Sequence, residues 1–230
     1  MRRSLSIFAL ALAAPTMPAA AIDVFPLSEG ILRTYESVSQ AGTSSYSTRF
    51  DGIAVVGNYS THVLHFAGGE DDGLQQQWSE TPEGDTLLHG WYRTDIQGGG
   101  EYSPPILWID VPLSLNKSWN VTTTMVGWGS VTLHFKVVAV DVVSVPAGRF
   151  ESFTIEWYTD EPLFAKAGAF GPTGQRASLS PESTPTAESY ADRAGMVRYR
   201  HGTEVDSLQR IEEIVAVESA TWTRVRELYR

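Results

Sequence analysis

The chain has 230 residues, a formal net charge of −10 and no cysteine. An acidic chain repels phosphate backbones, so the charge argues against nucleic-acid binding. The absence of cysteine excludes disulfide bonds, and the sequence predicts no lipidated N-terminal cysteine. With 42% hydrophobic residues, the chain is long enough for one well-packed core.

The first 21 residues have the pattern of a secretory signal peptide. Arg2 and Arg3 give a positive start, Leu5–Ala14 form an apolar run, and Ala19–Ala21 supply small residues for cleavage. Cleavage near Ile22 would take the net charge from −10 to −12 by removing the two arginines. We therefore expect a protein of the periplasm or the extracellular space, with no later transmembrane segment.

Residues 22–217 alternate between apolar strand patterns and short breaks such as Gly57-Asn58 and Gly98–Gly100. Alternation at period two suits half-buried strands, because successive side chains point to opposite faces. The candidate strands are Gly30–Gln40, Thr43–Val56, Ser60–Ala67, Leu74–Thr81, Asp85–Ile96, Ile106–Val111, Ser118–Val126, Ser130–Val143, Arg149–Thr159, Glu188–Asp192, Gly195–His201 and Asp206–Val217. This pattern predicts an all-β domain over 22–217, folded as a single curved antiparallel sheet or an open half-barrel.

The clearest strand pair flanks Pro146–Gly148. Apolar residues alternate from Val131 onward, and the run after the break repeats the pattern up to Trp157. Proline fixes φ and glycine permits a positive φ, so the break predicts a hairpin turn. Trp119 and Trp157 fall on the apolar face of their strands in this alternation, so we expect both in the core.

The last candidate strand changes phase. Leu208 falls on one face of the strand, whereas Ile211 and Val215 fall on the other. One extra residue shifts every following side chain to the other face, so the pattern predicts a β-bulge near Glu212-Glu213.

Two segments lack the strand pattern. Residues 160–187 form a long irregular insertion, interpreted as a flexible surface loop or, through Phe164 and Phe170, as a lid. Residues 218–230 are interpreted as a tail or a short C-terminal helix.

Three motifs carry a resemblance to known proteins. They are Pro112-Leu113 followed by Trp119, the run Val145-Pro146-Ala147-Gly148-Arg149-Phe150, and Tyr190 followed by Gly195-Met196-Val197. Between about Leu107 and Ile214 the chain resembles a widespread group of uncharacterised exported bacterial proteins. The resemblance implies the fold of the half-barrels of periplasmic lipoprotein carriers, which wrap one sheet around an apolar cavity. It implies no catalytic residue, and the long insertion departs from the short connection of the group.

No sequence pattern points to a metal or a cofactor, and we expect neither. His62 and His65 are three residues apart, which places them on opposite faces of a strand. Glu70-Asp71-Asp72 lacks the spacing of an EF-hand and is interpreted as an acidic turn.

Catalytic signals are weak. The chain has no Gly-x-Ser-x-Gly elbow and no cysteine nucleophile. Glu156, between Ile155 and Trp157, is a weak candidate for an acid catalyst of glycoside cleavage, and a solvent-facing carboxylate is its default interpretation.

Aromatic residues give a candidate ligand surface. Trp91, Tyr92 and Trp128 lie near predicted turns, and aromatic faces stack on sugars and on apolar ligands. Phe164 and Phe170 of the insertion are predicted to flank this surface.

The sequence favours an exported cell-envelope binding or scaffold protein. Its concave apolar and aromatic surface would bind an apolar small molecule, a glycan or an envelope protein. A secreted polysaccharide hydrolase or lyase with carboxylates and tryptophans in a cleft is the alternative, so the question of enzymatic activity stays open. A third hypothesis is an assembly subunit whose exposed strand edge pairs with a neighbour.

Overall fold

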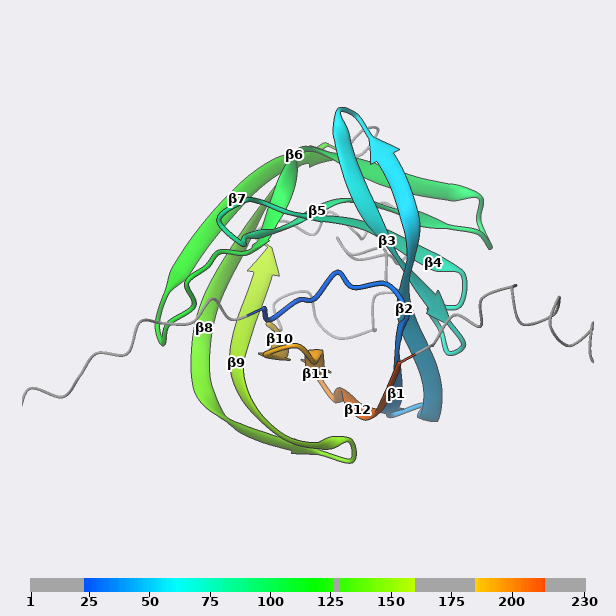
Figure 1. Cartoon of the computed structure of the whole chain (residues 1–230), viewed down its shortest axis with the longest axis vertical. Helices are drawn as coiled ribbons and strands as arrows, with labels where there is room; N and C mark the ends of the chain where they lie inside the picture. Colours follow the sequence, from blue (N-terminus) through cyan, green and yellow to red (C-terminus); the bar gives the residue numbers. More distant parts are fainter. Residues whose placement is uncertain (1–22, 126–128, 160–184, 214–230) are drawn as a thin grey trace, which may run out of the picture.

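Twelve strands of the described residues form one antiparallel barrel (Figure 1). The computed structural model describes residues 23–125, 129–159 and 185–213. The strands are β1 (Ile31–Ser39), β2 (Gly42–Val56), β3 (Tyr59–Ala67), β4 (Leu74–Glu80), β5 (Thr86–Arg93), β6 (Gly98–Ile109), β7 (Ser118–Met125), β8 (Gly129–Val145), β9 (Gly148–Thr159), β10 (Thr186–Ala191), β11 (Gly195–His201) and β12 (Glu204–Glu213). Strand neighbours follow chain order around the barrel.

The prediction of an open half-barrel is wrong, because β1 pairs with both β2 and β12. The register between the first and last strands runs from Ile31↔Glu213 to Val38↔Val205. Closure leaves neither β1 nor β12 as a free edge, whereas β6 and β7 are joined at only two register pairs, Tyr102↔Met125 and Ser103↔Thr124. The hypothesis of a strand edge that pairs with a neighbour stays a prediction.

Several predicted segments lie outside the described residues. They are the signal peptide 1–21, most of the insertion 160–187 and the tail or helix 218–230. Residues 186 and 187 of the expected insertion instead begin β10. In the described part of the chain, no helix is long and apolar enough to cross a membrane.

The hairpin predicted at Pro146–Gly148 is confirmed. Val145 pairs with Gly148, so Pro146 and Ala147 form the turn between β8 and β9, and Gly148 has a φ of 145°. The core positions predicted for Trp119 and Trp157 are also confirmed, since each side chain is 9% exposed.

The predicted break at Gly98–Gly100 is wrong, because these glycines begin strand β6. They allow β5 and β6 to approach closely. A Cβ on Gly99 would clash with the carbonyl oxygen of Trp91, and one on Gly90 would lie 2.5 Å from that of Gly100. The glycines here serve strand packing, not a turn.

The bulge expected at Glu212-Glu213 lies earlier in β12. Thr34 pairs with Arg210 and Tyr35 pairs with Leu208, so Gln209 is the extra residue. The bulge allows Leu208 to face the interior beside Tyr35, and both side chains are buried.

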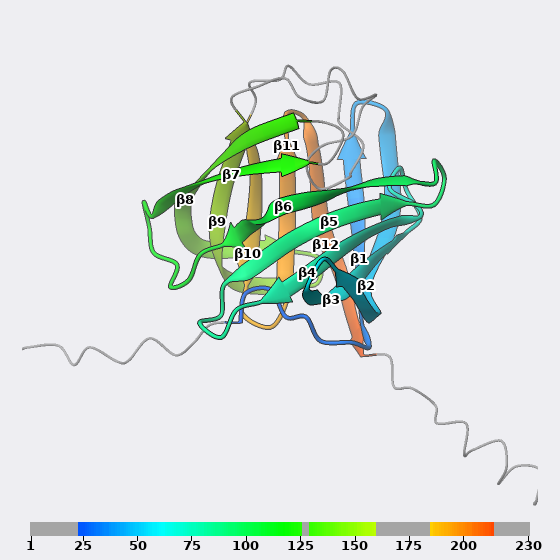
Figure 2. The same ribbon diagram turned by 90° about the horizontal axis from the view of Figure 1, so that it is seen from above.

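The interior has two ends separated by tyrosines. The residues before β1 cross one end of the barrel (Figure 1), and Figure 2 shows the same segment below the strands. Phe25 of this segment lies 4.6 Å from Trp78 and 5.8 Å from Tyr190, measured between ring centroids. Deeper inside, Tyr35 and Tyr46 stack with ring centroids 5.0 Å apart.

Candidate ligand-binding site

A cavity of about 60 Å³ lies at the barrel end that the N-terminal segment crosses. We call it the aromatic cavity; it is lined by Phe25, Pro26, Arg33, Tyr35, Thr48, Phe50, Leu64, Phe66, Gln76, Trp78, Trp108, Glu188, Tyr190, Gly195 and Met196. Strand alternation explains this lining, since Arg33 and Tyr35 share the inner face of β1, and Glu188 and Tyr190 share that of β10. Its walls are mainly aromatic and aliphatic, with few polar groups.

Arg33 is the positively charged group of this cavity. Its side chain is 4% exposed, and its Nε donates a hydrogen bond to the Ala194 carbonyl at 2.7 Å. Its Nη2 is buried and has no hydrogen-bond partner among the described residues. Burial lowers the pKa of Arg33, while Tyr35 and Asp23 act in the opposite direction.

Glycine next to the guanidinium provides the space that Arg33 occupies. Gly195 has a φ of 77°, which side-chain-bearing residues rarely adopt, and a Cβ there would lie 3.3 Å from Arg33 Nε. Gly195 and Met196 of the Gly195-Met196-Val197 motif thus help to shape the aromatic cavity.

Glu188 is held by three donors inside the barrel. The indole nitrogens of Trp108 and Trp157 donate to its carboxyl oxygens at 3.2 and 3.1 Å, and the Tyr190 hydroxyl donates a third hydrogen bond. Burial raises the pKa of Glu188, and these three hydrogen bonds act against the rise. Burial therefore favours the neutral carboxyl.

The aromatic cavity has one acidic and one basic side chain among the described residues that line it. No ion pair joins Glu188 to Arg33 in the described part of the chain, and the acidic group whose charge acts on Arg33 is Asp23, without a direct ion pair between them. Glycoside cleavage requires two carboxylates separated by about 5–10 Å. Glu188 is the acidic residue among those that line the aromatic cavity, and no second one lines it.

The predicted aromatic surface is not assembled as expected. Trp91 is 2% exposed and belongs to the core, whereas its neighbour Tyr92 is 37% exposed on the outer face of β5. At the end of β5 the buried Trp91 and the exposed Tyr92 point to opposite sides, so the two rings do not share one surface, and ligand binding by either ring stays a prediction. Trp128, Phe164 and Phe170 lie outside the described residues.

Glu156 lies on β9 with its neighbours Ile155 and Trp157 buried. Its register partners are Lys136 on β8 and Ala187 on β10. It lines neither the aromatic cavity nor the second pocket described below. A catalytic role for Glu156 therefore stays a prediction, and no described pocket surrounds the residue.

Arg33 and Glu188 were missed in the sequence. Each is a charged residue that shares one face of its strand with an aromatic residue two positions along, Tyr35 for Arg33 and Tyr190 for Glu188. Both tyrosines are buried. A charged residue on the apolar face of a strand was the pattern that could have revealed them. Burying such a charge costs free energy unless a protein partner or a ligand offsets it.

Comparisons with known proteins give similarities of fold. No family model and no curated protein matches the chain. A candidate exported protein with a YmcC-like fold from Bacteroides fragilis is 14% identical, with 83% of this chain and 99% of that chain covered and a TM-score of 0.48. A candidate lipoprotein from Parabacteroides distasonis is 12% identical, with the same coverages of 83% and 99% and a TM-score of 0.42.

Proposed function

We propose that the protein is an exported binding protein that holds an apolar molecule with a carboxylate head inside its barrel. The observation that carries the proposal is the buried Arg33, whose Nη2 lacks a hydrogen-bond partner among the described residues and which lines the aromatic cavity. Export rests on the leader pattern of residues 1–21.

The walls of the aromatic cavity favour the apolar part of such a ligand. Ligand sites are typically concave and apolar, with a few polar groups that fix orientation. Phe50, Leu64 and Phe66 from β2 and β3 line the space together with Trp78 and Trp108 from β4 and β6. Each methylene buried against them contributes about 0.8 kcal/mol.

The charge of Arg33 favours an anionic head. Burying an unpaired ion costs several kcal/mol, and a hydrogen-bonded counter-ion offsets this cost. Since Nε already serves the Ala194 carbonyl, Nη2 is the donor left for a ligand. Because burial raises the pKa of Glu188 and favours its neutral form, Glu188 competes less with the ligand for that charge.

The volume limits the ligand. A water molecule needs roughly 10–15 Å³ of such space, so the aromatic cavity of about 60 Å³ takes a carboxylate and a short chain. A longer chain must pass Phe25, which lies 6.0 Å from Phe50 between ring centroids and covers the mouth. Short alkanoates are therefore the appropriate probes.

A headgroup series tests the proposal. Hexanoate, methyl hexanoate and 1-hexanol share a chain length and differ in charge, so only hexanoate can pair with Arg33. We expect hexanoate to bind at least about tenfold more tightly than either neutral analogue, because a charge-assisted hydrogen bond contributes about 1.5–3 kcal/mol. Calorimetry gives the affinities, and Trp78 and Trp108 provide a fluorescence signal in the cavity wall.

Two results would reject the proposed function. Equal affinity for hexanoate and 1-hexanol would show that Arg33 does not recognise the head. Absence of both heat and fluorescence change at millimolar hexanoate would show that the aromatic cavity takes no carboxylate of this size.

A further inference from the structure

A second pocket, of about 40 Å³, lies at the opposite end of the barrel from the aromatic cavity. We call it the acidic pocket; it is lined by Ser37, Ser39, Ser44, Tyr46, Glu70, Asp71, Tyr199, Glu204 and Asp206. The two sites lie at opposite ends because Arg33 is near the start of β1 and Ser39 is its last residue. The stacked Tyr35 and Tyr46 rings separate them.

Asp206 has an unsatisfied oxygen in this pocket. The residue is 4% exposed, and its Oδ2 accepts a hydrogen bond from the Tyr46 hydroxyl at 2.8 Å. Its Oδ1 is buried and has no hydrogen-bond partner among the described residues. A buried acceptor without a donor is costly, so the oxygen marks a place where a ligand donor would be stabilising.

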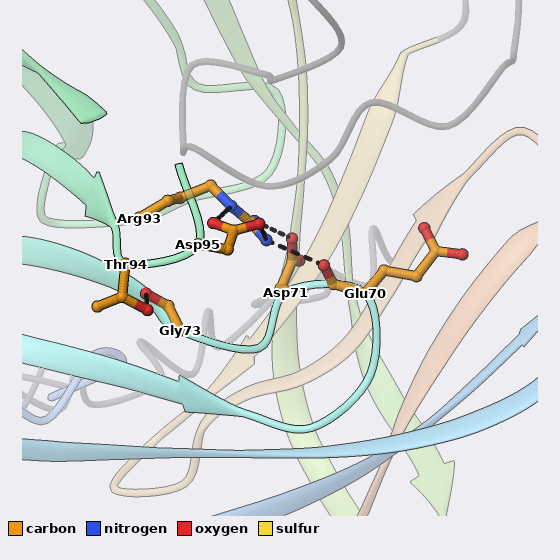
Figure 3. A network of polar contacts seen from close by, with 6 residues as sticks. All are labelled: Glu70, Asp71, Gly73, Arg93, Thr94 and Asp95. Carbon is orange, nitrogen blue, oxygen red and sulfur yellow. Dashed lines mark hydrogen bonds and ion pairs between the residues drawn. The ribbon is translucent and has the colours of Figure 1, made fainter. Parts of the chain in front are cut away.

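The nearby arginine is already engaged elsewhere. Arg93 is fully buried, and it pairs with Asp71 at 2.9 Å and with Asp95 at 3.1 Å (Figure 3). Its Nη2 also donates to the Glu70 carbonyl at 3.0 Å, while Figure 3 shows the Glu70 side chain turned away from the guanidinium. Arg93 thus fixes the turn before β4 at the rim of the pocket. No ion pair reaches Glu204 or Asp206 within the described ranges.

The donor set fits an organic cation better than a metal ion. Among the described residues, no group of three or more acidic or histidine side chains is arranged to hold a metal ion. Ser39 and Ser44 offer hydroxyl acceptors, and Tyr199 also lines the pocket, whereas the Tyr46 ring is stacked on Tyr35 and Phe66. An ammonium group has three donors for such acceptors and a size that fits the pocket.

We propose that the acidic pocket binds a primary ammonium group, supplied by a free alkylamine or by a lysine side chain. This inference is independent of the proposed function, since the two sites share no lining residue. Asp206 and Glu204 are the counter-ions.

Binding depends on the ionisation of Glu204. Burial, and then Asp206, Glu70 and Asp71, raise the pKa of Glu204 to about 7, and the Ser37 hydroxyl lowers it. Tyr199 on β11 also faces this group, and burial raises its pKa well above the ordinary value, so it stays neutral. Amine affinity should therefore increase as the pH rises from 6 to 8, because Glu204 gains its negative charge over that range.

Calorimetry on the full chain tests this inference with cadaverine, Nα-acetyl-lysine methylamide and the neutral control 1-pentanol. We expect both amines to bind and 1-pentanol not to bind. Tighter binding of cadaverine would identify a free amine as the source of the ammonium group. Tighter binding of the lysine derivative would identify a lysine side chain as the source. Asp206→Asn should weaken the amines at least tenfold and keep hexanoate binding. Asp141→Asn, at an exposed position of β8, should change neither.

If Asp206→Asn does not fold, Glu204→Gln replaces it, since Glu204 is only half-buried. This variant should weaken amine binding and remove the increase between pH 6 and 8. The inference is overturned if the amines give no heat, if they bind Asp206→Asn as tightly as wild type, or if only Ca²⁺ binds.

Discussion

Replacement of Arg33 by methionine is expected to lower hexanoate affinity on the order of 100-fold, because truncating one partner of a buried charge pair costs about 2–5 kcal/mol. Methionine keeps much of the apolar length of the side chain and removes the guanidinium. Binding of 1-hexanol should change little, so the variant loses headgroup discrimination while the aromatic cavity remains. Calorimetry on wild type and variant with both ligands measures this loss.

Arg49→Met is the matched control for this experiment. Arg49 lies on β2, its side chain is 49% exposed, and it pairs with Asp51 at 2.7 Å on the barrel surface. The same substitution there should leave both affinities unchanged. If Arg33→Met binds hexanoate as wild type does, the carboxylate does not meet Arg33, and the assignment of the head position fails.

Replacement of Glu188 by methionine should destabilise the barrel by about 2–4 kcal/mol, because each buried donor left unsatisfied costs about 1–3 kcal/mol. The Trp157 indole and the Tyr190 hydroxyl both lose an acceptor in this variant, whereas Trp108 retains the Tyr190 oxygen at 3.0 Å. Urea unfolding of the two proteins gives the difference in free energy of unfolding. A loss below 1 kcal/mol would show that Glu188 does not organise these side chains.

Glu188→Gln separates the charge of Glu188 from its hydrogen bonds. Burial raises the folded-state pKa of Glu188 above 4.5, so the folded protein holds this proton more tightly than the unfolded chain. The stability it contributes is present below about pH 4.5 and is lost as the pH rises through the folded-state pKa. Glutamine cannot ionise, so the variant should gain stability relative to wild type as the pH rises.

Glu156→Gln is the control for this pH dependence. It makes the same change on the neighbouring strand β9, at a half-buried position that lines neither pocket. The control should keep the wild-type stability profile between pH 4 and pH 8. A Glu188→Gln profile parallel to that of wild type would contradict the raised pKa.

The strand positions were predictable because their cause is local. Each candidate range overlaps an observed strand, and the Pro146–Ala147 turn follows from two residues with strong backbone preferences. Alternation also predicted which side of β9 is buried, as Trp157 shows. These features depend on neighbours within a few residues of one another.

Closure and register were not predictable in the same way. Nothing near Ile31 indicates that β1 pairs with Glu213 at the other end of the domain. The phase change of β12 showed that a bulge exists, but its location at Gln209 depends on the partner strand, where Thr34 and Tyr35 change register. A glycine run such as Gly98–Gly100 equally suits a turn and a close strand pair until the neighbouring strand is known.

The candidate site was the least predictable part, because it is assembled from residues far apart in the chain. Glu188 meets Trp108 and Trp157, which are 80 and 31 residues away. Arg33 reaches the Ala194 carbonyl across 161 residues. The sequence shows the charged residues but not the enclosed surroundings that give them their chemistry.

The most direct test of the central claim follows the carboxyl carbon of bound hexanoate by ¹³C NMR during an acid titration. If the carboxylate pairs with Arg33 inside the barrel, the bound ligand should remain ionised at pH values where free hexanoate is already protonated. A bound ligand that titrates at the same pH as free hexanoate, or that binds preferentially as the neutral acid, would contradict the account.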